Sequence, residues 1–243
     1  MATTIPLDIP IARPSGERRV YTWAALVALI VVFAGFAPTY YLKGAFGTPD
    51  LSTIKHVHGV VMTAWFVFFL VQVRLVATGN TQTHRKLGVL GVVLAFLLVS
   101  VGMLTGIASA RAGVTPLPSI PPLAFLVMPV GELLIFTTLF TAAIILRKRS
   151  AYHKRLMLLA SVALLTPAMA RLPFEFVSTG GPPAFFGLTD LIILACIAFD
   201  TVKNRRLHPA FIAGFVVVVV GQLGRIFVAR TPEWMTFAKW LVG

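Results

Sequence analysis

The stretch KHVHGVVMTAWFVFFLVQV, residues 55–73, decides the class of fold. It is apolar almost throughout, and with its neighbours it reaches the roughly 20 residues that cross a bilayer core as a helix. Two histidines, His56 and His58, stand at its start, where polar side chains facing lipid are costly. The stretch therefore predicts a transmembrane helix and raises the question of what the histidines contact.

The composition extends this prediction to the whole chain. The 243 residues are 58% hydrophobic and 12% charged, with a mean hydropathy of +0.89. Soluble domains are about 25% charged. The formal charge of +13 therefore indicates basic loops between spans and no nucleic-acid partner. Cys196 is the only cysteine, which excludes a disulfide framework and a CxxC metal site.

Seven apolar runs predict an all-α, polytopic transmembrane helical bundle with about seven spans in contact with lipid. The runs cover residues 21–37, 57–78, 87–108, 123–146, 155–169, 185–202 and 209–228. The fifth run is the shortest, and Pro167 is expected to kink its last turn. We divide the chain into a polar tail (1–19), a transmembrane domain (20–229) and an amphipathic interfacial segment (230–243) that ends the chain.

Basic residues collect in the tail and in the loops that follow the second, fourth and sixth spans. The positive-inside rule then places the N-terminus in the cytoplasm and the C-terminus outside, in a bacterial inner membrane. The clusters are Arg13, Arg18 and Arg19; Arg85 and Lys86; Arg147, Lys148, Arg149, Lys154 and Arg155; and Lys203, Arg205 and Arg206.

Helical periodicity separates the two histidines of the opening stretch. His58, Trp65 and Gln72 fall seven residues apart on one face, whereas His56 lies about 200° around the helix from His58. His58 is therefore expected to face the bundle interior, and His56 the headgroup level.

Three further histidines recur at the basic turns, in THRKLG (His84), YHKRLM (His153) and RRLHPAF (His208). We expect three similar hairpins that place these histidines, with Gln72, in one layer near the cytoplasmic side. Haem iron is held by axial ligands such as histidine, so any two of the three could bind haem b. In the alternative interpretation, each histidine only orients its turn at the interface.

A second polar layer is expected nearer the outside. His58, Glu132 and Asp190 would together form a site of two acids and one histidine, which suits iron, manganese or zinc. The alternative is an ion-pair network, because buried charges normally pair. Its further members would be Arg171, Glu175, Gln222 and Arg225, and it could serve as a site for a quinone or a polar headgroup.

The residues His58, Gln72 and His84-Arg85-Lys86-Leu87-Gly88 resemble a signature of uncharacterised bacterial multi-span membrane proteins. In that family a histidine in one span is followed by a glutamine near its inner end and by an HRxxG turn. The resemblance spans residues 58–88 and implies a haem or redox role for His58, Gln72 and His84.

These patterns favour a membrane redox protein that binds haem or a transition metal and exchanges electrons with a quinone or another membrane partner. Two alternatives stay open: an accessory or assembly subunit with a structural polar network, and a proton-coupled transporter. The last span has no lysine for a retinal Schiff base, and five histidines are too few for a desaturase-type di-iron site.

Overall fold

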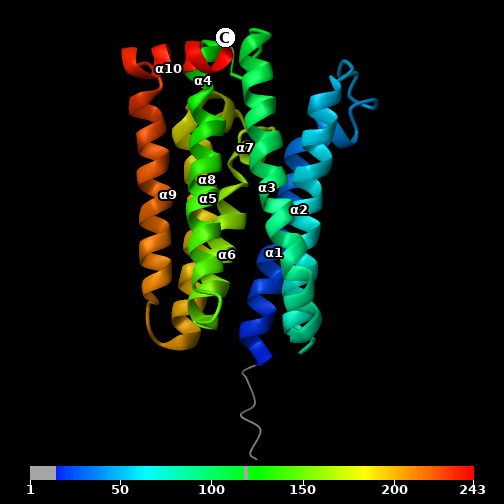
Figure 1. The fold of residues 1–243 in the computed structure, drawn as a ribbon, viewed down its shortest axis with the longest axis vertical. Coiled ribbons are helices and arrows are strands. Elements are labelled where there is room, and N and C mark those ends of the chain that lie inside the picture. Colours follow the sequence, from blue (N-terminus) through cyan, green and yellow to red (C-terminus); the bar gives the residue numbers. More distant parts are fainter. Residues whose placement is uncertain (1–14, 118–119) are drawn as a thin grey trace, which may run out of the picture.

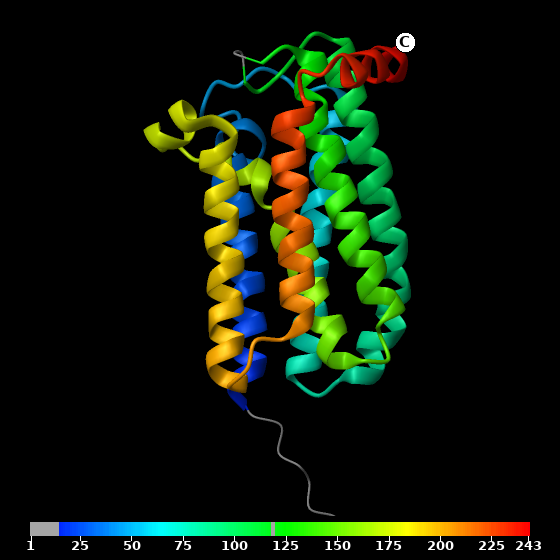
Figure 2. The same ribbon diagram turned by 90° about the vertical axis from the view of Figure 1, so that its left-hand side faces the viewer.

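The structure, a computed structural model, describes residues 15–117 and 120–243. Within these residues every regular element is a helix. Figures 1 and 2 show the long helices running side by side, which confirms the predicted all-α bundle. Most of the predicted tail lies outside the described residues, and the first helix begins at Ser15, inside the predicted tail.

Six helices of the described residues are long and apolar enough to cross a membrane, so the chain is an integral membrane protein. The helices are α1 (Ser15–Phe36), continued by the π-helical turn η1 (Ala37–Tyr41), α2 (Thr53–Ala77), α3 (Thr81–Arg111), α4 (Pro122–Phe125), α5 (Val127–Ile145), α6 (Ser150–Ala163), α7 (Thr166–Met169), α8 (Glu175–Asn204), α9 (Pro209–Val228) and α10 (Pro232–Val242). The six spans are α1 with η1, α2, α3, α4 with α5, α8, and α9.

The fifth predicted span is an interrupted helix inside the bundle. It consists of α6 and the short α7, with Pro167 in the first turn of α7. Helices α1, α5, α8 and α9 all contact α6, and nearly all of its second half is buried. A helix enclosed by other helices can carry breaks and charges, because its neighbours satisfy the freed polar groups.

The turns α2–α3, α5–α6 and α8–α9 lie together at the lower end of the bundle in Figure 1. We call it the basic end, since it carries Arg85, Lys86, Arg147, Lys148, Arg149, Arg205 and Arg206. The chain ends at the opposite, C-terminal end, where α10 lies across the bundle (Figure 2). In α10, Trp234 and Ala238 are buried, whereas Phe237 and Trp240 are exposed.

Two of the three predicted hairpins are closely packed pairs, α2 with α3 and α5 with α6. In the third, α8 packs mainly on α7, α1 and α6, whereas α9 packs on α5 and α6. One face of α3 carries the glycines Gly91 and Gly102. It packs within the chain, with Gly91 against Phe68 and Gly102 against Leu133. Small residues on this face allow the close helix approach.

Gly35 of α1 provides a test of another close contact, the one between α1 and α7. A Cβ atom there would clash with the backbone carbonyl of Ala168, which ties α1 to α7. We expect Gly35→Ala to destabilise the protein by about 1–3 kcal/mol, as overpacking does. Thermal unfolding in detergent measures the effect. The control is Gly224→Ala, where a Cβ meets open space, and equal stability of both variants would contradict the packing.

Candidate functional site

Two of the three turn histidines come together at the basic end. His84 on α3 and His153 on α6 have ring centroids 6.3 Å apart, with their planes at 71°. The rings come from helices that are not sequence neighbours, so the tertiary fold creates the pair. We call His84 and His153 the histidine pair.

Gln72, which lies on the same face of α2 as His58 and Trp65, orients the ring of His84. With its amide turned to suit its surroundings, the Gln72 nitrogen donates to His84 Nδ1 (2.6 Å) and to the His84 carbonyl (3.3 Å). The Gln72 oxygen then accepts from the amide of Gly88 (3.3 Å). This orientation is assigned from the hydrogen-bond partners. Gln72 is itself buried, so its amide is satisfied by these partners on α3 and not by bulk water.

The ring of His153 is oriented by α5. Its Nδ1 lies 2.9 Å from the carbonyl oxygen of Ala143, which can only accept, so Nδ1 carries the hydrogen. The other ring nitrogen, Nε2, is then left with a lone pair. A histidine whose Nδ1 donates to a backbone carbonyl has the arrangement usual for a metal-binding Nε2.

His208, the third turn histidine, has a different role. Its Nδ1 accepts from the amide of Ala210 (3.1 Å) and caps α9, and its ring packs edge-on to Tyr152 at 4.7 Å. Burial and the charge of Arg155 lower the pKa of His208 below its usual value. His208 therefore stays neutral and keeps its cap at neutral pH.

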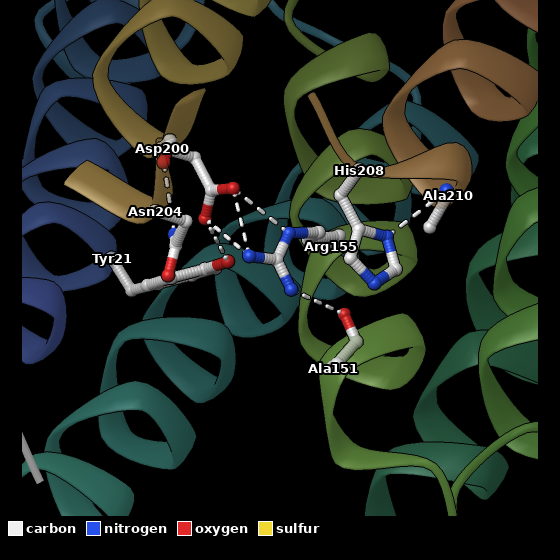
Figure 3. A network of polar contacts seen from close by, with 7 residues as sticks. All are labelled: Tyr21, Ala151, Arg155, Asp200, Asn204, His208 and Ala210. Carbon is white, nitrogen blue, oxygen red and sulfur yellow. Dashed lines mark hydrogen bonds and ion pairs between the residues drawn. The ribbon is translucent and has the colours of Figure 1, made fainter. Parts of the chain in front are cut away.

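Figure 3 shows a second polar group at the basic end, centred on Arg155 of α6 and Asp200 of α8. The guanidinium donates to the carboxylate through Nε and Nη2 at 2.7–3.0 Å, and the two side chains are only 4% and 3% exposed. Tyr21 of α1 donates to the same carboxylate at 3.5 Å. The ion pair therefore joins α1, α6 and α8.

Sequence reasoning placed Arg155 among the loop cations and did not identify this pair. His153 and Arg155 lie about 200° apart around α6. One therefore points to α3 and α5, and the other to α8. The available signal was the coincidence of Asp200 inside one apolar run and Arg155 at the start of another.

A second buried contact between an arginine and an acid lies nearer the C-terminal end of the bundle. Arg225 of α9 binds Glu132 of α5 at 2.5 Å, and their side chains are only 4% and 5% exposed. Arg225 also donates to the carbonyl oxygens of Met128 and Gly221, and its guanidinium stacks over Phe186 at 4.6 Å. The other carboxylate oxygen of Glu132, Oε1, is buried without a hydrogen-bond partner.

The rest of the predicted network is only partly assembled. Gln222 donates to Asp190 at 2.9 Å, and Arg225 acts electrostatically on that carboxylate. Arg171, however, donates to the carbonyl of Pro167 (2.7 Å) and lies over the ring of Phe36, so it pairs with none of the acids in the described residues. Glu175 is exposed on the first turn of α8. Arg171 and Glu175 thus differ from the prediction, because their helix ends turn them away from Glu132 and Asp190.

The predicted metal site of His58, Glu132 and Asp190 is not assembled. Over the two described ranges, no three histidine, cysteine or acidic side chains are grouped so that they could hold a metal ion. Glu132 and Asp190 instead bind Arg225 and Gln222. The physical reason is that a cation and an amide already occupy the acids that a metal would need.

His56 and His58 lie apart, as helical geometry predicts. His56 is exposed beside Tyr40, with ring centroids 6.0 Å apart. His58 Nδ1 is buried without a hydrogen-bond partner, within electrostatic range of Arg171. His58 therefore lies in the half of the bundle near α10, and Gln72 lies near the opposite, basic end of α2.

Comparison with protein-family models, curated proteins and solved structures found no match for this chain.

The Arg155–Asp200 pair makes a stability prediction. Asp200→Asn leaves a buried guanidinium uncompensated, which costs about 3–5 kcal/mol. Thermal unfolding in detergent should show a large loss for Asp200→Asn and almost none for the exposed Glu175→Gln. The double variant Arg155→Met/Asp200→Leu should recover most of the loss, since it leaves no buried charge. A mild effect of Asp200→Asn would contradict a structural role for the pair.

His208 makes a prediction about pH. Its folded pKa is lowered, so the stability it contributes is complete above the unfolded pKa of about 6.5 and is lost as the pH falls through the folded value. Protonation of Nδ1 also removes the acceptor that caps α9. The unfolding temperature should fall less between pH 7 and pH 5 in His208→Asn, which can cap without titrating. Identical pH profiles would contradict this assignment.

Proposed function

We propose that this integral membrane protein binds a b-type haem at the histidine pair and transfers electrons within the membrane. The observation that supports the proposal is the meeting of His84 and His153, from α3 and α6, with ring centroids 6.3 Å apart. Axial histidines from separate helices are a common way of holding haem iron in proteins.

The number of protein ligands favours haem over a bare metal ion. A bare transition-metal ion needs three or more protein ligands to be held firmly. The described residues offer no such group. A porphyrin supplies four nitrogen ligands itself, so two histidines complete the coordination of its iron.

The hydrogen bond of His153 supports the same ligand. Ligation through Nε2 requires the hydrogen on Nδ1, and His153 already meets this requirement through the Ala143 carbonyl. At His84 the ligating tautomer requires the Gln72 oxygen at Nδ1, so the amide has to turn by half a turn. That turn gives up its hydrogen bonds with the His84 carbonyl and the Gly88 amide.

The surroundings of the pair suit the acidic edge of a haem. Arg85 acts electrostatically on His84, and Arg85 and Lys86 are exposed at the basic end. Cations there can bind the propionates. If the positive-inside rule holds, the haem lies near the cytoplasmic face of the inner membrane. A quinone or another membrane redox protein is then the natural electron partner.

An absorption spectrum tests the proposal. Protein purified from cells supplied with a haem precursor should show a Soret band, and dithionite should sharpen its α and β bands. His84→Ala and His153→Ala should each lose most of the haem per protein. The matched control is His56→Ala, because His56 is exposed and remote from the pair.

A colourless wild-type protein with a normal helical circular-dichroism spectrum would overturn the proposal. It would favour an accessory subunit in which the polar groups are structural. Equal haem retention in all three variants would also contradict it, because the histidine pair would then not hold the iron.

A further inference from the structure

We propose that Glu132 is a protonated carboxylic acid inside the membrane-spanning bundle and a site that binds and releases one proton. Its carboxyl group lies beside the Met128 carbonyl, since Arg225 Nη1 donates to both. Met128 is six residues after Pro122, about 9 Å along the span, so the site lies within the roughly 30 Å core on the side of the C-terminal end. The inference uses none of the residues of the histidine pair and is independent of haem.

The first observation is the unequal surroundings of its two oxygens. Oε2 accepts from Arg225 at 2.5 Å, whereas Oε1 is buried without a partner. The whole residue is 4% exposed, and Oε1 is shielded from bulk solvent. A carboxylate accepts at both oxygens, and leaving one unsatisfied inside the bundle is costly.

The second observation is the state of the neighbouring hydroxyl. Thr166 of α7 is in side-chain hydrogen-bond contact with Glu132, and its hydroxyl also donates to the carbonyl of Ala163 (2.9 Å). A hydroxyl has one hydrogen and can also accept. While Thr166 donates to Ala163, its oxygen can accept a hydrogen from a protonated Glu132.

The third observation is the balance of charge. Arg225 faces Glu132 from α9 and is also the cation that acts on Asp190 of α8. Arg171, which follows α7, lies over the Phe36 ring and acts electrostatically on His58 instead. Two carboxylates and one guanidinium carry a net charge of −1, which is costly at this depth. One bound proton makes the cluster neutral, with Arg225 balancing Asp190.

Infrared spectroscopy of the full-length protein in lipid nanodiscs tests the proposal. At neutral pH the wild type should show the carbonyl stretch of a protonated carboxyl, and the stretch should shift in D₂O. Glu132→Gln should abolish the band with an unchanged unfolding temperature, because the amide keeps the shape and supplies a donor to Thr166. Glu175→Gln is the matched control and should retain the band, since Glu175 is exposed.

Two outcomes overturn the proposal. One is the absence of a protonated-carboxyl band in the folded wild type. The other is a band that survives Glu132→Gln and disappears in Asp190→Asn, which would place the proton on Asp190. A band that is lost in Glu132→Gln and retained in Asp190→Asn supports it.

A sodium ion could balance the same charge, and a thermal assay distinguishes the two cations. If the site takes a proton, NaCl and choline chloride should give the wild type the same unfolding temperature at fixed pH. A rise with NaCl alone that is lost in Glu132→Gln would overturn the proton assignment. The absorption spectrum of Glu132→Gln should match that of the wild type, so failure here leaves the haem proposal standing.

Discussion

A charge inside a membrane needs a partner, and the centre of this bundle depends on that constraint. Helix α6 carries Arg155 into a region where the side chain is 4% exposed, and Asp200 of α8 binds it through two guanidinium nitrogens. Because the pair joins α6 to α8, α6 can occupy the interior that the outer helices enclose. The position of α6 in turn fixes the place of His153 against Ala143 of α5 and opposite His84 of α3.

The two polar regions share helices but differ in chemistry. At the basic end, the two imidazole rings of the histidine pair are oriented by an amide and a carbonyl. Nearer the C-terminal end, Glu132 and Arg225 contact each other directly and are almost excluded from solvent. Eleven residues of α5, about 16 Å, separate Glu132 from Ala143. The haem that we propose at the histidine pair and the proton that we propose on Glu132 would share no side chain.

The sequence predicted the helices well because apolar runs of bilayer length leave few alternatives. It also placed His56 and His58 on opposite faces, since the helical period alone decides that point. It did not predict which cation binds which acid. Arg171 resembled Arg225 in depth, but α7 ends just before it, and only Arg225 reaches Glu132. Periodicity gives the face of one helix, whereas pairing depends on how neighbouring helices are rotated about their axes.

The interrupted form of α6 and α7 has a consequence for how the chain is made. A short helix that carries His153, Lys154 and Arg155 in its first two turns is a poor substrate for insertion on its own. Its counter-charge, Asp200, is synthesised 45 residues later, and α9 later still. Residues 150–169 should therefore reach their final position only after α8 has emerged from the ribosome. In this protein, an internal segment would then be placed after a helix that follows it in the sequence.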